Sequence, residues 1–179
     1  MEFRKLRIKD LIPASYNPRK KLKPGDKEFE KIKNELLVVL FEKVISIEHV
    51  GSTSVEGMYA KPIIDIDIVI DYNFEEVKRL LESIDYIHEG DLGILGREAF
   101  KYNNKEHLMV HHIYVCNKNN EELHRHIIFR NYLRNHKEER DKYSDVKRKM
   151  ALKYPEDIES YIKGKEQVIL EIYKKCGLE

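Results

Sequence analysis

Two aspartates two positions apart are the residues in this sequence with the clearest potential for chemistry. Asp65 and Asp67 interrupt the apolar run Ile63–Ile70. Side chains alternate across a strand, so both carboxylates point to one face and the isoleucines between them to the other. Two carboxylates on one face of an apolar strand repel each other and lose water, and a cation relieves both costs. Mg2+ suits such a pair, since it binds one or two carboxylates together with substrate phosphates and water.

A small polar turn precedes this strand. Gly51 allows a sharp backbone turn and the close approach of a ligand. Ser52, Thr53 and Ser54 are good N-cap residues and predict a short helix over about 54–59. Free N–H groups at a helix start favour phosphate, so we interpret Gly51, Ser52 and Thr53 as a phosphate cradle, which Lys61 could also reach. Each feature alone has an ordinary alternative: a simple turn, a solvated strand end, a surface lysine. Their order and close spacing favour nucleotide phosphate chemistry.

These segments resemble the GrpB family of the nucleotidyltransferase superfamily. The resemblance covers the chain from about Tyr16 to about Tyr173, and it is carried by His49–Val55, Lys61–Ile66, Val110–Val115, His126–Arg134 and Tyr161–Lys165. It implies a nucleotidyltransferase-like fold, in which Gly51 and Ser52 open a helix beside a strand with two metal-binding carboxylates. It further implies that Asp65 and Asp67 are catalytic and hold Mg2+ or Mn2+.

The sequence also departs from the pattern of that family. The usual Val-Pro-Gly is Val55-Glu56-Gly57, and the third histidine of the later strand is replaced by Tyr114. A third carboxylate, which the wider superfamily takes from a later strand, has no evident counterpart; His112 and Tyr114 lie where it would be expected. Two hypotheses therefore stay open. The protein binds a nucleoside triphosphate with Mg2+ and transfers a nucleotidyl group to an unidentified acceptor, or it is a catalytically reduced module that binds a nucleotide or another phosphorylated ligand.

Other basic residues are secondary candidates. Arg130 and Arg134 recur at the four-residue spacing that places side chains on one helix face. Such a face is usually solvated, but the resemblance favours a role in neutralising substrate phosphates. Lys165 is a possible lining residue, and His49 is expected to pack near the phosphate loop or hydrogen-bond to it. A zinc site would need three or four converging ligands, and we favour magnesium.

Composition limits the remaining possibilities. The chain has 179 residues, 33 basic and 32 acidic, for a formal net charge of +1. A near-neutral chain gives no overall case for nucleic acid or a membrane surface as partner. Cys116 and Cys176 are expected to be free thiols in a reducing cytoplasm, because we find neither a signal-peptide pattern nor a stretch long enough to span a membrane. The oligomeric state is not indicated.

Periodicity predicts the elements that position these residues. Apolar residues at helical spacing indicate a helix over about 24–41, and the capping residue Asn73 favours another over 74–83. Strands are expected at 3–8, 44–50, 63–70, 86–88, 97–102 and 107–116, and further helices at 121–136, 137–153, 155–163 and 165–176. The fold class is thus α/β (α+β), with a mixed sheet flanked by helices. Residues 1–118 would form the sheet domain, and residues 119–179 a C-terminal helical subdomain packed on it.

Overall fold

The structure is a computed structural model that describes residues 27–178. The strand predicted at 3–8 and the start of the helix predicted from residue 24 lie outside the described residues. In chain order the elements are α1 (Lys27–Leu40), β1 (Ser46–Val50), the 3₁₀ turn η2 (Ser52–Ser54), β2 (Ile64–Ile70), α2 (Phe74–Glu82), β3 (Tyr86–Gly90), β4 (Arg97–Tyr102), β5 (His111–Asn117), α3 (Glu121–Asn135), α4 (Lys137–Lys153) and α5 (Ile158–Lys175).

The strands form one mixed sheet in the order β1-β2-β5-β4-β3. β2 pairs with β1 in antiparallel and with β5 in parallel orientation, and the β5–β4 and β4–β3 pairs are antiparallel. The predicted mixed α/β architecture with flanking and C-terminal helices is confirmed. β2 lies between β1 and β5, and both aspartates are paired in register with residues of each neighbour.

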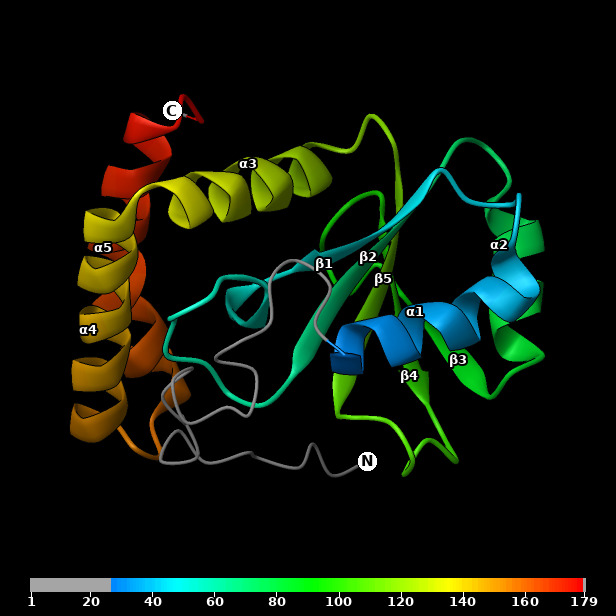
Figure 1. The fold of residues 1–179 in the computed structure, drawn as a ribbon, viewed down its shortest axis with the longest axis horizontal. Helices are drawn as coiled ribbons and strands as arrows, with labels where there is room; N and C mark the ends of the chain where they lie inside the picture. The colour runs from blue at the N-terminus through cyan, green and yellow to red at the C-terminus, as the bar shows by residue number, and fades with distance from the viewer. Residues whose placement is uncertain (1–26, 179) are drawn as a thin grey trace.

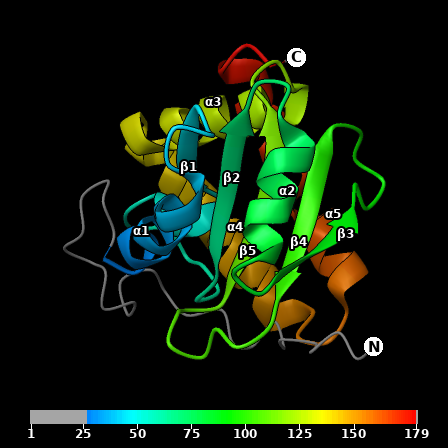
Figure 2. The ribbon, with the colours of Figure 1, turned by 90° about the vertical axis from the view of Figure 1, so that its right-hand side faces the viewer.

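One face of the sheet carries the main hydrophobic core. Helices α1 and α2 cover this face (Figure 2). Ile32 and Leu36 of α1 pack with Ile64 and Ile66 of β2, and all four are fully buried. Burying one such side chain contributes about 1.5–3 kcal/mol, so this face anchors β2. The aspartates consequently point to the opposite face.

Helices α3, α4 and α5 lie on that opposite face, with α3 above the sheet and the α4–α5 pair beside it (Figure 1). The side chain of Asn120 caps α3 by accepting a hydrogen bond from the backbone N–H of Leu123, at 3.0 Å. Leu123 packs with Val69 and Cys116 in a small buried cluster. Cys116 and Cys176 are both free thiols, as predicted.

Three local predictions were wrong. No helix follows Ser54, because Val55 is already extended at φ −114° and ψ 113° and the turn stops there. Asn73 does not cap α2 with its side chain; its amide instead donates to the Lys43 carbonyl at 2.8 Å. The strand predicted from residue 107 begins only at His111.

The two helices predicted at 155–163 and 165–176 form the single helix α5. Gly164 lies inside it, where an added Cβ would come within 2.3 Å of the Met150 sulfur on α4. The glycine therefore allows α4 and α5 to approach closely and does not break the helix.

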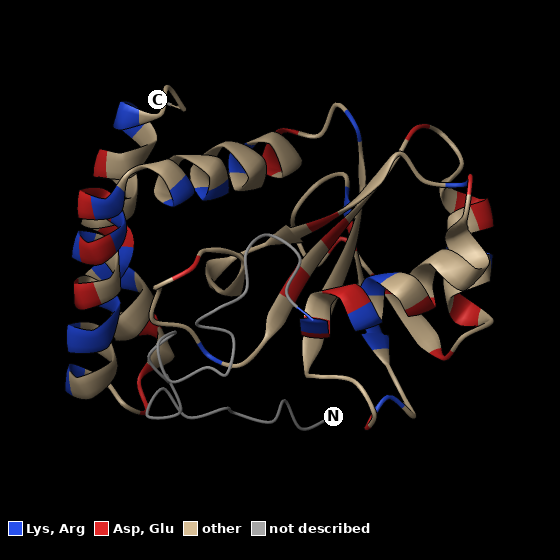
Figure 3. Ribbon diagram, viewed as in Figure 1, with Lys and Arg blue, Asp and Glu red and all other residues tan. Residues whose placement is uncertain are grey.

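Basic and acidic residues alternate along the C-terminal helices (Figure 3). No helix among residues 27–178 is long and apolar enough to cross a membrane. The division of the chain after residue 118 stays a prediction, which limited proteolysis would test.

Candidate functional site

Each aspartate of β2 lies between one residue of β1 and one residue of β5. Asp65 pairs in register with Val50 on β1 and His112 on β5, and the Asp65 Oδ1 lies 2.9 Å from the His112 Nδ1. Asp67 pairs with Glu48 and Tyr114. The side chain of Asp65 is 33% exposed and that of Asp67 is fully buried. The two carboxylates thus share a face but differ in their access to solvent.

Gly51 brings the backbone against Asp65. Its φ of 68° lies in the left-handed region, and a Cβ at this position would fall 2.2 Å from the Asp65 Oδ2. No residue with a side chain fits this conformation and this space together. The sequence predicts a ligand at this close approach, whereas the structure places the Asp65 carboxylate there, directly beside the turn Ser52–Ser54.

Asp67 is held by a histidine of α3. The His126 Nδ1 lies 2.7 Å from the Asp67 Oδ2, whereas the Asp67 Oδ1 is buried without a hydrogen-bond partner among the described residues. Burial lowers the pKa of His126, but its hydrogen bond to Asp67 and the charge of that carboxylate outweigh burial, and the net shift is upward. The orphan oxygen is costly in a protein interior, which makes it a candidate donor to a bound cation.

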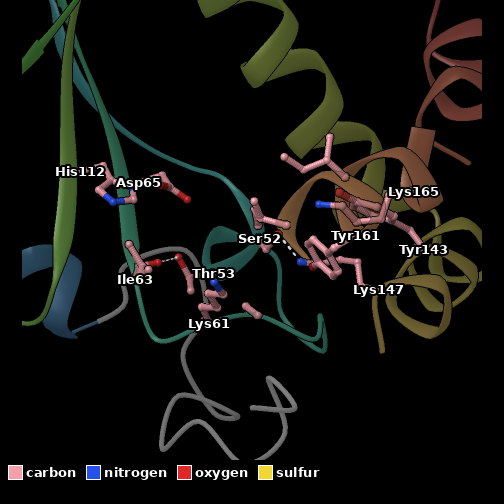
Figure 4. Close-up of a pocket in the computed structure, with 13 residues that line it drawn as sticks. Ser52, Thr53, Lys61, Ile63, Asp65, His112, Tyr143, Lys147, Tyr161 and Lys165 are labelled. Carbon is pink, nitrogen blue, oxygen red and sulfur yellow. Dashed lines mark hydrogen bonds and ion pairs between the residues drawn. The ribbon is translucent and has the colours of Figure 1, made fainter. Parts of the chain in front are cut away.

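A pocket of about 310 Å³ opens beside Asp65. Its described lining comes from two separate stretches of chain, Ser52, Thr53, Ala60, Lys61, Ile63, Asp65 and His112 on one side and Tyr143, Lys147, Ile158, Tyr161, Ile162 and Lys165 on the other. Figure 4 shows Asp65 and His112 on one wall, the lysines and tyrosines of α4 and α5 on the opposite wall, and Ser52 between them. The lining has the size of a small-molecule site.

Two lysines project into this pocket from the C-terminal helices. The Lys147 Nζ donates to the Ser52 Oγ at 2.5 Å, and this side chain is only 4% exposed. Burial, with a smaller contribution from Lys165, lowers its pKa to about 7. The Lys165 Nζ lies 4.1 Å from the centre of the Tyr161 ring. Burial, followed by the charge of Lys61, lowers the pKa of Lys165 to about 8.

Thr53 and His49 brace the turn. The Thr53 hydroxyl donates to the Ile63 carbonyl at 2.9 Å and lies 3.1 Å from the His49 Nε2. His49 is buried and stacks on Phe29, with ring centroids 4.8 Å apart. These contacts tie the turn to the start of β2. His49 does hydrogen-bond to the phosphate-loop candidate, as expected, and it is not among the residues that line the pocket.

The two arginines of α3 contact the backbone around the turn. The Arg130 Nη1 donates to the Glu48 Oε2 and to the His49 carbonyl, both at 2.9 Å. Arg134 donates through Nε and Nη2 to the Ser54 carbonyl, at 2.9 and 2.8 Å. Neither lines the pocket beside Asp65, although Arg130 lines a smaller cavity of about 120 Å³ on the other side of Gly51 and Ser52. A role for these arginines in phosphate binding stays a prediction.

Strand β5, next to the aspartates, offers no third carboxylate. β5 carries no acidic residue, and Tyr114, beside Asp67, is covered by Arg97 at 4.2 Å from its ring centre. Burial, followed by the charge of Asp65, raises the pKa of Tyr114. Glu48 is paired with Asp67 on the other side, but it is bound to Arg130. The described site therefore presents two carboxylates, with a third held in an ion pair.

These donors fit Mg2+ better than they fit a protein-only metal cage. Over residues 27–178 no group of three histidine, cysteine, aspartate or glutamate side chains converges in a way that could hold a metal by protein ligands alone. Two carboxylates with one orphan oxygen match the habit of Mg2+, which takes its other ligands from substrate phosphates and water. Asp65 and Asp67 are the residues that would hold it.

Sequence reasoning passed over two residues of this site. Lys147 falls four residues after Tyr143 and four before Ala151, both buried on the same stripe of α4. A lysine on an apolar helical stripe is the signal that would have identified it. His126 lies four residues before Arg130, on the same face of α3, but spacing alone cannot reveal that Asp67 faces it.

The chain is similar to a protein family model, to several bacterial proteins and to a solved crystal structure. A family model described as "GrpB protein" matches residues 24–175. "UPF0157 protein YqkA" of Bacillus subtilis is 37% identical over 145 residues, which cover 79% of this chain but only 41% of that protein. "Glutamate-rich protein GrpB" of Alkalihalophilus pseudofirmus is 34% identical, covering 80% of this chain and 86% of that protein. The "Crystal structure of conserved protein GrpB from Enterococcus faecalis" matches with a TM-score of 0.73 and 30% identity, covering 86% of this chain and 93% of that chain.

Proposed function

This chain belongs to the GrpB family, and from that premise and the geometry of the pocket we propose that it is a nucleotidyltransferase. It binds a nucleoside triphosphate with Mg2+ and transfers the nucleotidyl group to an acceptor hydroxyl. The observation that carries this proposal is the pair Asp65 and Asp67 on one face of β2, with Gly51 and Ser52 against Asp65 and a pocket at their side. The nucleotidyltransferase-like fold is part of the same proposal.

The residues divide the work between positioning and charge. Ser52 and the adjacent backbone hold the outer phosphates, and Asp67, fixed through its Oδ2 by His126, leaves its Oδ1 without a partner among the described residues and available to a metal ion. A magnesium ion held by Asp65 and Asp67 supplies charge neutralisation at the reacting phosphate. No helix starts after Ser54, so helix N–H groups do not contact the phosphates there. The side-chain cations of the pocket supply the positive charge that the phosphates need.

The transfer itself needs no nucleophilic side chain. The acceptor oxygen bonds to the α-phosphorus, the bond from the α-phosphorus to the bridging oxygen breaks, and pyrophosphate leaves. The hydroxyl proton passes to Asp65, the one carboxylate among the described lining residues of the pocket. Catalysis then comes from orientation and electrostatic stabilisation.

Thermal stability measured across a panel of nucleotides, each with and without Mg2+, tests the binding half of this proposal. A ligand that binds only the folded state stabilises it by about 2.7 kcal/mol at a hundredfold excess over its dissociation constant. We expect a Mg2+-dependent rise in Tm with at least one triphosphate, which Asp65→Asn abolishes. The absence of a shift with every nucleotide would refute the triphosphate proposal.

A second candidate is a binding module that does not turn over its ligand. Each aspartate already lies within hydrogen-bond distance of a histidine, and β5 offers no third carboxylate. Release of pyrophosphate on incubation with candidate acceptors separates the two. An enzyme releases it and loses that activity in an Asp65→Asn, Asp67→Asn double variant, whereas a binding module releases none and keeps metal-free affinity for its ligand in the same variant.

A further inference from the structure

The wall of the pocket that faces Asp65 consists of side chains from α4 and α5. Lys147 of α4 and Lys165 of α5 line the pocket on this wall, and the Lys147 ammonium donates a hydrogen bond to the Ser52 hydroxyl. Gly164 lets α5 pack closely against Met150 of α4, so the two helices bring both lysines to one space. The lysine pair is therefore a product of the helix packing and not of a mobile surface loop.

Within residues 27–178 neither lysine has a carboxylate close enough to form an ion pair, and the charge of Asp65 offsets the burial of Lys147 only in part. In the part of the chain that the structure describes, no aspartate or glutamate oxygen lies within ion-pair distance of the Lys147 or Lys165 Nζ atom. Lys147 is 4% exposed and bonds only to a hydroxyl, and Lys165 lies over an aromatic ring. Burying an ammonium without a counter-ion costs several kcal/mol. A site of this kind is completed by an anion that the ligand brings.

The lining restricts the charge of that anion. Among the described lining residues, Lys147 and Lys165 place two ammonium groups on one wall, and Asp65 is the one carboxylate. Several ammonium groups around one space suit a ligand with several negative charges along its length, and lysine binds phosphate as a point charge. The single carboxylate lies on the wall opposite Lys147 and Lys165 (Figure 4).

We infer that Lys147 and Lys165 are the anchor for the polyphosphate chain of the ligand, with the phosphates lying along the α4–α5 wall between Ser52 and Lys165. This inference rests on the proposed function, because it assigns the phosphate end of the same pocket. It adds two residues of the C-terminal helices as specificity-determining groups and names the ligand class that they select.

Proton uptake is a consequence of this arrangement. Groups from three elements surround Lys147: Ser52 from η2, Asp65 from β2, and Lys165 from α5, while Tyr143 lies beside it on α4. Burial and Lys165 lower its pKa to about 7, so most of the Lys147 side chain is neutral at pH 8. A polyanion binds the charged form, and the pocket therefore takes up protons as it fills.

Isothermal titration calorimetry with inorganic tripolyphosphate tests the inference without any metal or nucleoside. The titration is done at pH 8 in EDTA, in two buffers of different ionisation enthalpy, so that proton uptake is read directly. We expect binding by the wild type with net uptake of protons. Lys147→Met and Lys165→Met should each weaken binding by about tenfold or more, the loss of one charge-assisted hydrogen bond.

Controls separate this site from a general attraction of anions. Lys149→Met, an exposed lysine on the same helix, should leave the affinity unchanged, and citrate should bind much more weakly than tripolyphosphate. Unchanged affinity in both Lys147→Met and Lys165→Met, or equal binding of citrate, would overturn the inference. Lys165→Met provides the test if Lys147→Met does not fold.

The inference and the proposed function can fail separately. Tripolyphosphate binding through the lysines without any Asp65-dependent nucleotide effect would retain the anchor and reject nucleotidyl transfer. If the nucleotide effect depends on Asp65 but the lysine variants bind tripolyphosphate normally, nucleotidyl transfer would be retained and the lysine anchor rejected.

Discussion

Replacing Lys147 with methionine should stabilise this protein, and by an amount that depends on pH. The side chain is 4% exposed, and its pKa is lowered from 10.5 to about 7. The gap between these values corresponds to about 4–5 kcal/mol of preference for the neutral amine in the folded state. Methionine fills nearly the same volume without a charge, so the variant escapes this penalty and loses only the bond to Ser52, worth about 1 kcal/mol.

The direction with pH follows from the number of bound protons. Between pH 7 and 10.5 the unfolded chain keeps its proton on Lys147 and the folded chain releases it, so wild-type stability rises with pH. The penalty is complete below the folded pKa and absent above the unfolded pKa. The advantage of Lys147→Met should therefore shrink by about 3–4 kcal/mol between pH 7 and pH 10.

Urea unfolding of both proteins at pH 7, 8, 9 and 10 measures this difference. Buffers without phosphate or other polyanions are needed, because an anion in the pocket would stabilise the wild type. Lys149→Met, on the exposed side of the same helix, is the matched control and should differ from the wild type by a constant amount. A Lys147→Met variant that is less stable than the wild type at pH 7, or a difference that does not change with pH, would refute the reasoning.

Two further predictions concern the aspartates. Gly51→Ala should lose about 2 kcal/mol or more of unfolding free energy, because φ is 68° and the new Cβ would lie 2.2 Å from the Asp65 Oδ2. The control Gly93→Ala, with φ 83° and open space around it, should lose about 1 kcal/mol. Equal losses in urea unfolding would contradict the close approach of Gly51 to Asp65. His126→Asn should remove a stabilisation that is complete below about pH 6.5 and fades as the pH rises through the folded pKa of His126, which Asp67 raises; a wild-type advantage that grows from pH 6 to 9 would count against this pair.

The core of the site could be predicted because it depends on one strand. Alternation alone places Asp65 and Asp67 on the same face, and their neighbours Ile64 and Ile66 on the other, and both placements hold in the sheet. The glycine before Ser52 was identified as a point of close approach, though its partner was not. Such local patterns suffice when the chemistry and the scaffold share the same few residues.

The opposite wall could not be predicted because it depends on contacts between distant segments. The helical period places Arg130 and Arg134 on one face of α3, but only the fold reveals that Glu48 and backbone carbonyls lie opposite. Lys147 reaches Ser52 across 95 positions of sequence. Gly164 was taken as a boundary between helices, since a glycine lowers helix propensity, and the compensating contact with α4 is tertiary.

The pocket is formed only when two separate stretches of the chain pack together. Residues 52–112 provide Ser52, Asp65 and their neighbours, and residues 143–165 provide the lysines, so neither stretch carries the site alone. If the proposed ligand binds in this pocket, its binding requires both stretches to be folded and packed together. Fragments 1–118 and 119–179, produced separately and mixed, would make this protein a complementation sensor in which a bound polyanion signals reassembly.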